Sequence, residues 1–149
     1  MQLKNKARKP VSGKGMKAGI AVSRFNEDIT KKLLDAAKTA LQESGIKETD
    51  ITVLEVPGAV EIPYALQELA RTKKYTVLIA IGCVIQGDTP HFDYVCKMAQ
   101  EGTLRVSLDH HIPIGFGVLT VNTEKQARAR IHVGAEAAMA ALELANLKK

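Results

Sequence analysis

Residues that could bind an anion and move protons lie together between Gly87 and His91. Their order is Gly87-Asp88-Thr89-Pro90-His91, and an apolar segment with helical spacing follows directly. Backbone amides at the start of a helix, together with the helix dipole, make a ready site for a phosphate group. A histidine there could accept and donate protons near pH 7. The alternative interpretation is a tight turn capped by Thr89, in which His91 has no chemical part.

The sequence lacks the motifs of several common ligand sites. It has no Gly-x-x-x-x-Gly-Lys-Ser/Thr loop and no Gly-x-Gly-x-x-Gly turn after the first predicted strand, so the usual nucleotide-binding loops are missing. Cys83 and Cys96 show no metal-ligand spacing, and we expect reduced thiols and no metal. A phospho-acceptor signalling domain is disfavoured, because no acidic cluster follows the first strand and no aspartate ends the third.

Short apolar runs and segments with helical spacing follow one another along the chain, and they predict four strands and four helices. We expect the strands at residues 16–22, 51–56, 75–82 and 112–119, and the helices at 26–44, from 59 onward, 92–107 and 123–146. Asn26 and Thr89 should cap helices, Gly45 should end the first helix, and Gly134 should mark a kink in the last. This order predicts an α/β protein with a four-stranded parallel sheet and helices on both faces.

Residues that could contact a ligand follow each predicted strand. Phe25 follows the first strand, and residues 57–61, 87–91 and 120–122 follow the others. Parallel strands end at the same edge of a sheet, so these segments should meet there and form a ligand site. Phe25 could stack on a flat ligand, or it could simply pack onto the first helix.

Length and charge indicate one domain with a basic N-terminal arm. The chain has 149 residues and a net charge of +5. Six basic residues fall within the first 17, namely Lys4, Lys6, Arg8, Lys9, Lys14 and Lys17. We expect residues 1–14 to form an arm outside the core and residues 15–149 to form a single domain. Because the excess basic charge belongs to the arm, we expect no nucleic-acid partner.

Hydrophobicity argues against a membrane protein. No apolar run approaches the roughly 20 residues that span a bilayer, and the N-terminus lacks the apolar segment of a signal peptide. We therefore expect a cytoplasmic protein with no membrane partner. The exposed edges of a small sheet and an apolar face on the alanine-rich last helix predict a homo-oligomer.

Four segments together resemble the lumazine synthase family of riboflavin biosynthesis, in its order and spacing. They are Arg24-Phe25-Asn26, Val56-Pro57-Gly58-Ala59-Val60-Glu61-Ile62-Pro63, Gly87-Asp88-Thr89-Pro90-His91-Phe92-Asp93-Tyr94-Val95 and Phe116-Gly117-Val118-Leu119-Thr120. The resemblance implies a flavodoxin-like three-layer αβα sandwich that uses no cofactor or metal. It also implies a homopentamer, in some members a shell of sixty subunits, with active sites between subunits.

The resemblance implies a transferase reaction and its partners. The family condenses 5-amino-6-(D-ribitylamino)uracil with 3,4-dihydroxy-2-butanone 4-phosphate. The products are 6,7-dimethyl-8-ribityllumazine, inorganic phosphate and water. The lumazine then passes to riboflavin synthase.

A role for each matching residue follows from the same resemblance. The uracil ring and ribityl chain would be bound by Phe25, Ala59, Val60, Glu61, Cys83, Val84, Ile85 and, from a neighbouring subunit, Phe116. Phosphate would be bound by Asp88, Thr89 and Arg130, and His91 would donate and accept protons. The segment after Arg130 departs from the family pattern, because it is shorter and lacks a lysine.

Two other functions remain open from the sequence. One is a flavodoxin-like module that carries flavin or nucleotide without catalysis, although Ser23-Arg24-Phe25-Asn26 is not a Ser/Thr/Gly-rich phosphate loop. The other is a catalytically weak paralogue that binds lumazine or flavin. The shortened segment after Arg130 is its only support.

Overall fold

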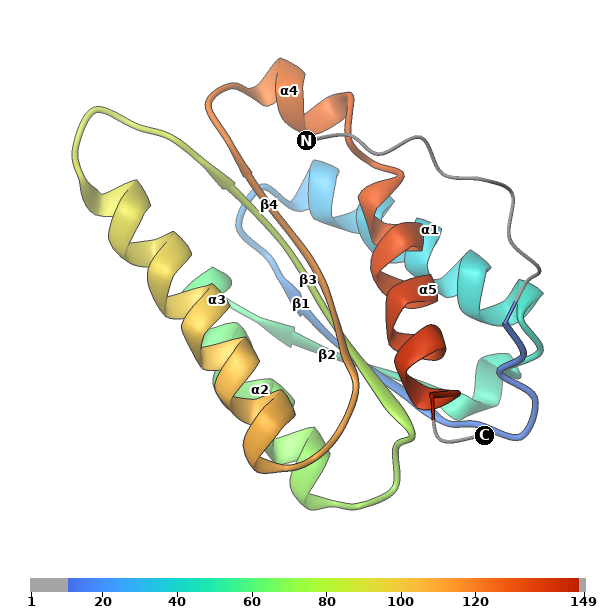
Figure 1. Ribbon diagram of the computed structural model, residues 1–149. Coiled ribbons are helices and arrows are strands. Elements are labelled where there is room, and N and C mark those ends of the chain that lie inside the picture. The colour runs from blue at the N-terminus through green and yellow to red at the C-terminus, as the bar shows by residue number, and fades with distance from the viewer. Residues whose placement is uncertain (1–10, 148–149) are drawn as a thin grey trace.

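A four-stranded parallel sheet, in the order β2-β1-β3-β4, forms the centre of the computed structural model, which describes residues 11–147 (Figure 1). Its strands are β1 (Ala18–Ser23), β2 (Ile51–Val56), β3 (Val77–Ile85) and β4 (Ile114–Val121). Helices α1 (Glu27–Glu43) and α5 (Val133–Ala145) cover one face, and α2 (Ile62–Arg71) and α3 (His91–Asp109) cover the other. Shorter helices are η1 (Glu48–Asp50), η2 (Ala59–Glu61) and α4 (Glu124–Arg128). The predicted parallel α/β sandwich is confirmed.

Apolar side chains on both faces of the central strands explain the two-sided sheet. Every residue of β1 is buried, and β3 is buried from Val77 to Cys83. One core cluster lies between the sheet and α1 with α5, and a second lies between the sheet and α2 with α3. Strands covered on both faces are apolar at nearly every position, and the sequence has that pattern.

β3 is longer than its sequence pattern predicted, and this shapes the ligand edge. The predicted strand ended at Gly82, whereas β3 continues to Ile85. Gly82 permits close packing inside the sheet, because a Cβ there would lie 2.9 Å from Ser23 Oγ. Pairing with β1 stops at Val22–Ile81, while pairing with β4 continues to Ile85–Val121. The end of β3 therefore projects beyond β1.

The two predicted ends of α1 had different outcomes. Gly45 ends the helix as expected, with a φ of 110° that favours glycine. The prediction of a side-chain cap by Asn26 is wrong, because Asn26 occupies the N-cap position without making a side-chain cap bond. Its amide binds elsewhere, at the end of β3.

The last predicted helix is divided into α4 and α5 by a turn at residues 129–132. Gly134 lies inside α5 and not at a kink, which corrects the prediction. A Cβ at Gly134 would lie 2.1 Å from the Leu33 carbonyl oxygen, so glycine lets α5 approach α1 closely. Ala137, Ala138 and Ala141 are buried by this packing. The alanine-rich face is therefore covered within the chain and is not a surface for association. The predicted homo-oligomer must use other surfaces.

Large apolar side chains are instead exposed on α3. Tyr94, Met98, Leu104 and Leu108 all lie on the surface of this helix. Within residues 11–147, no helix has the length and hydrophobicity needed to cross a membrane.

Most of the predicted N-terminal arm, residues 1–10, lies outside the described residues. The next part of it contacts the domain. Val11 packs against the α1–α5 core, and the Gly13 N–H donates to the Ser44 carbonyl at 2.8 Å.

Candidate functional site

A pocket of about 370 Å³ lies at the carboxyl edge of the sheet, where the chain leaves β1, β2 and β3 and enters α3. Eight residues that the sequence proposed for a site line it together: Phe25, Ala59, Val60, Cys83, Val84, Ile85, Thr89 and His91. Gly58, Gly87, Phe92 and Val95 complete the lining. Phe92 and Val95 were not predicted, although Val95 lies one helical turn after His91 and so shares its face.

Phe25 offers its ring to the pocket from an anchored loop. The Arg24 N–H donates to the Val56 carbonyl at 2.8 Å, and the Phe25 N–H donates to the Pro57 carbonyl at 3.1 Å. The phenyl ring itself is 71% exposed. A fixed backbone with a free aromatic face is suited to stacking on a flat ring.

The segment after β2 forms a second wall through a short helical turn. The Gly58 N–H donates to Glu61 Oε1 at 2.9 Å, which closes the turn over η2. Ala59 and Val60 line the pocket, whereas Glu61 does not. The Glu61 carboxylate thus stabilises the turn by accepting a hydrogen bond from Gly58. Its binding of ribityl hydroxyls stays a prediction.

The projecting end of β3 supplies the third wall. Cys83, Val84 and Ile85 lie there, and the Cys83 carbonyl accepts a hydrogen bond from Asn26 Nδ2 at 2.9 Å. Burial raises the pKa of the Cys83 thiol to about 11, with smaller contributions from the charges of Asp28 and Glu124. A thiol of that pKa is protonated at neutral pH, so Cys83 is no nucleophile there.

The start of α3 forms the remaining wall. Pro90, not Thr89, occupies the N-cap position of α3, which corrects the prediction, although Thr89 Oγ1 accepts a hydrogen bond from the His91 N–H at 3.3 Å. Gly87, Thr89 and His91 line the pocket, whereas Asp88 is not among the lining residues. The positive end of α3 and His91 thus lie at the same pocket.

Four predicted site residues do not line this pocket: Glu61, Asp88, Phe116 and Arg130. Phe116 is 39% exposed on β4, on the same strand face as Val118. Arg130 follows α4, and its Nη1 donates to the Gln126 carbonyl at 2.9 Å. The single chain therefore brings Phe25 and His91 to one pocket, but not Arg130.

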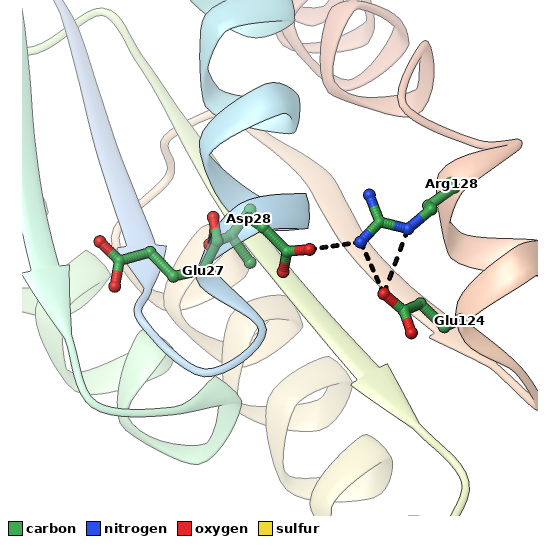
Figure 2. Close-up of polar contacts among 5 residues, drawn as sticks. Glu27, Asp28, Glu124 and Arg128 are labelled. Carbon is green, nitrogen blue, oxygen red and sulfur yellow. Dashed lines mark hydrogen bonds and ion pairs between the residues drawn. The ribbon is translucent and has the colours of Figure 1, made fainter.

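A charged cluster beside the pocket joins α4 to α1 (Figure 2). The Arg128 guanidinium pairs with Asp28 and lies 2.6 Å from Glu124 Oε1. The hydrogen bond from Arg128 holds the pKa of the Asp28 carboxyl below its ordinary value. Among residues 11–147, no three His, Cys, Asp or Glu side chains are grouped to hold a metal ion.

Fold and pocket together define a flavodoxin-like three-layer α/β protein with a pocket at the carboxyl edge of the sheet. The family model for 6,7-dimethyl-8-ribityllumazine synthase matches residues 15–149. The chain is also 44% identical over 142 residues to a 6,7-dimethyl-8-ribityllumazine synthase from Kosmotoga olearia, covering 92% of this chain and 91% of that protein. The chain belongs to the 6,7-dimethyl-8-ribityllumazine synthase family.

Proposed function

We propose that this pocket is where the chain condenses 5-amino-6-(D-ribitylamino)uracil with 3,4-dihydroxy-2-butanone 4-phosphate. The products are 6,7-dimethyl-8-ribityllumazine, phosphate and water, in the penultimate step of riboflavin biosynthesis. One observation carries the proposal. An exposed aromatic ring, a projecting strand edge and a helix start with a histidine all face one cavity.

The pocket walls divide the two substrates between them. Phe25 stacks on the pyrimidine, and Cys83, Val84 and Ile85 contact its edge through backbone groups. Ala59, Val60 and Glu61 hold the ribityl chain. Asp88 and Thr89 bind the phosphate at the start of α3, where amides and the helix dipole favour an anion. Arg130 adds positive charge to that end of the site.

The chemistry requires proton transfer more than a protein nucleophile. The 5-amino group of the uracil attacks the ketone, and loss of water gives an imine. Proton abstraction then expels inorganic phosphate, and the resulting enol tautomerises to a ketone. The ribitylamino nitrogen closes the ring with loss of a second water. His91 donates and accepts these protons, while the pocket holds both reactants in contact.

A second subunit completes the site in this proposal. Phe116 lies outside the pocket of its own chain, yet it is a partly exposed aromatic side chain. Exposed apolar residues on α3 provide a surface for association. We propose a homopentamer that covers the pyrimidine with Phe116 of a neighbour. Light scattering distinguishes it from a shell of sixty subunits, and a monomer at working concentration would contradict it.

Location and product transfer complete the proposal. The chain acts in the cytoplasm without a cofactor and delivers its lumazine to riboflavin synthase. A catalytically weak paralogue that binds lumazine or flavin is the other candidate, and neither the matching family model nor the relative favours it.

Mixing the two substrates with the protein tests the function directly. We expect lumazine absorbance and fluorescence to appear far faster than in the same mixture without protein. A rate equal to the uncatalysed rate would exclude the enzyme, and tight lumazine binding at that rate would indicate the weak paralogue.

A further inference from the structure

Asn26 has a backbone conformation that needs an explanation. Its φ of 61° and ψ of 48° are left-handed, a conformation that glycine adopts freely and that asparagine tolerates better than most other residues. The Asn26 carbonyl accepts from the N–H groups of Ile29 and Thr30, each at 3.0 Å, so it begins α1. The side chain, however, makes no cap bond to that helix. An N-cap asparagine ordinarily uses its side chain for that bond.

The Asn26 amide instead reaches a different strand. Nδ2 donates to the Cys83 carbonyl at 2.9 Å, across 57 positions of sequence. Cys83 lies beyond Ile81, the last β3 residue that pairs with β1. The amide of Asn26 therefore takes the place that a further β1 residue would occupy beside β3.

Backbone alternation shows why this bond bears on the pocket. The Gln86 N–H donates to the Val121 carbonyl of β4 at 2.9 Å, so even-numbered residues here turn their backbone groups toward β4. Cys83 and Ile85 turn theirs the other way, where β1 has ended. The Asn26 amide is hydrogen-bonded to the Cys83 carbonyl, whereas Ile85, which lines the pocket, lies beyond this bond.

The same short loop ties down the other walls. Arg24 and Phe25 donate backbone hydrogen bonds to Val56 and Pro57 at the end of β2. Asn26 adds the bond to β3. Three consecutive residues thus connect the ends of β1, β2 and β3, and each of these ends contributes to the pocket lining.

We propose that Asn26 is a positioning residue of the site. Its amide fixes the spacing between the Phe25 ring and the backbone edge of Cys83–Ile85, which is the slot for a flat, hydrogen-bonding ring. The left-handed backbone is required for this reach. The choice of the pyrimidine as the ring in that slot rests on the proposed function.

Two substitutions at Asn26 separate the side-chain bond from the backbone conformation. Asn26→Gly keeps the left-handed conformation at no steric cost and removes the amide. Asn26→Asp keeps the shape but places an oxygen, and no donor, against the Cys83 carbonyl. Lys73→Gly is the matched control, since Lys73 also has a left-handed φ, 59°, and lies outside the pocket lining.

Steady-state kinetics give the first readout. We expect both Asn26 variants to raise KM for the ribitylaminouracil by about 5- to 10-fold, the effect of losing one typical hydrogen bond. KM for the butanone phosphate and kcat should change less than twofold, and Lys73→Gly should change none of the three. An Asn26→Gly variant with native KM would overturn the proposal, because the backbone conformation alone would then suffice.

Amide hydrogen exchange gives a second readout that needs no enzymatic activity. We expect faster exchange at residues 82–86 in both Asn26 variants and unchanged exchange in α5. If the native protein made no lumazine but exchange rose as expected, the proposed function would fail while the positioning role stood. Unchanged exchange at residues 82–86 would refute the positioning role whatever the activity.

Discussion

Arg128 on α4 forms an ion pair with Asp28 in the first turn of α1, although 100 positions separate them (Figure 2). Glu124 shares the same guanidinium from one turn earlier on α4. α4 has only five residues, so its own helical bonds hold it weakly. The pair with Asp28 fixes α4 beside α1, and with it the start of the segment that contains Arg130.

We expect Asp28→Asn to weaken binding of the phosphorylated substrate. The KM for the butanone phosphate should rise about twofold to fivefold, because one exposed ion pair contributes only that much to a binding constant. The kcat should be almost unchanged. Glu27→Gln is the matched control, because Glu27 pairs within its own helix, with Lys31 at 3.0 Å. Steady-state kinetics at low salt measure both. The difference should vanish near 1 M salt, where charges are screened within about 3 Å.

The same pair predicts a pH dependence of stability. Arg128 lowers the pKa of Asp28 below 3.8 in the folded protein, so the pair stabilises the fold above that pH. As pH falls through the lowered pKa, Asp28 is protonated and the contribution is lost. Urea unfolding of native protein and Asp28→Asn should therefore differ in stability at pH 7, and the difference should shrink as pH falls below 3.8. A difference that stays constant as pH falls would show that the effect does not come from the charge of Asp28.

Arg130 and His91 should contribute unequally to turnover. In the proposed function Arg130 stabilises the departing phosphate, so we expect Arg130→Ala to slow turnover by about 100- to 1,000-fold. His91→Ala should cost less than about 100-fold, since His91 is exposed and water can carry its protons. Lumazine formation at saturating substrate measures both, and Lys125→Ala on α4 controls for loss of a nearby charge. The reverse ranking would show that proton transfer limits the reaction.

Cys83 should resist alkylation despite lying in the pocket. Burial raises its pKa from 9.0 to about 11, so at pH 8 it has about one hundredth of the thiolate of an ordinary thiol. Native protein treated with iodoacetamide at pH 8 should keep its activity, with Cys83 unmodified by mass spectrometry. Reactivity should grow as pH rises toward 11. Rapid modification of Cys83 at pH 8 would mean that the native pocket opens.

The sequence predicted the elements better than their ends. Apolar runs identified all four strands, because a sheet covered on both faces needs apolar residues throughout. The pattern stopped β3 too early, since Gly82 suggested a strand end where it permits close packing against Ser23. It also missed the break before α5, because good helix formers lie on both sides of the turn: Glu, Lys, Gln, Ala and Arg in α4, and alanine-rich sequence in α5.

The site was predicted in part for a similar reason. Residues at strand exits converge because parallel strands end at one edge, and eight of the proposed residues line one cavity. The Asn26–Cys83 bond has no signal in sequence spacing, because it joins the loop after β1 to the end of β3, and only the fold brings these two segments together. Phe116 and Arg130 lie outside the pocket of their own chain. Their distance from this pocket depends on the fold and has no signal in the spacing of the sequence.

Gly134→Ala should destabilise the fold, although alanine is the better helix former. The new Cβ would meet the Leu33 carbonyl at 2.1 Å, and overpacking of this kind costs about 1–3 kcal/mol. Urea unfolding at fixed protein concentration should show a lower midpoint with an unchanged slope. Gly87→Ala is the control for stability, since a Cβ there meets no atom within 4 Å. Equal stability of the two variants would mean that α5 can shift away from α1.

The close contacts at Gly115 and Gly134 determine where the chain can accept an insertion. A Cβ at Gly115 would lie 1.9 Å from the Ala137 carbonyl, so backbone lies directly on backbone there, as it does between Gly134 and Leu33. These contacts seat α5 independently of the turn at residues 129–132, and the pair with Asp28 seats α4 on the other side. The turn between them is therefore free to lengthen. A loop grafted after Arg130 would add new groups next to this arginine without moving either helix.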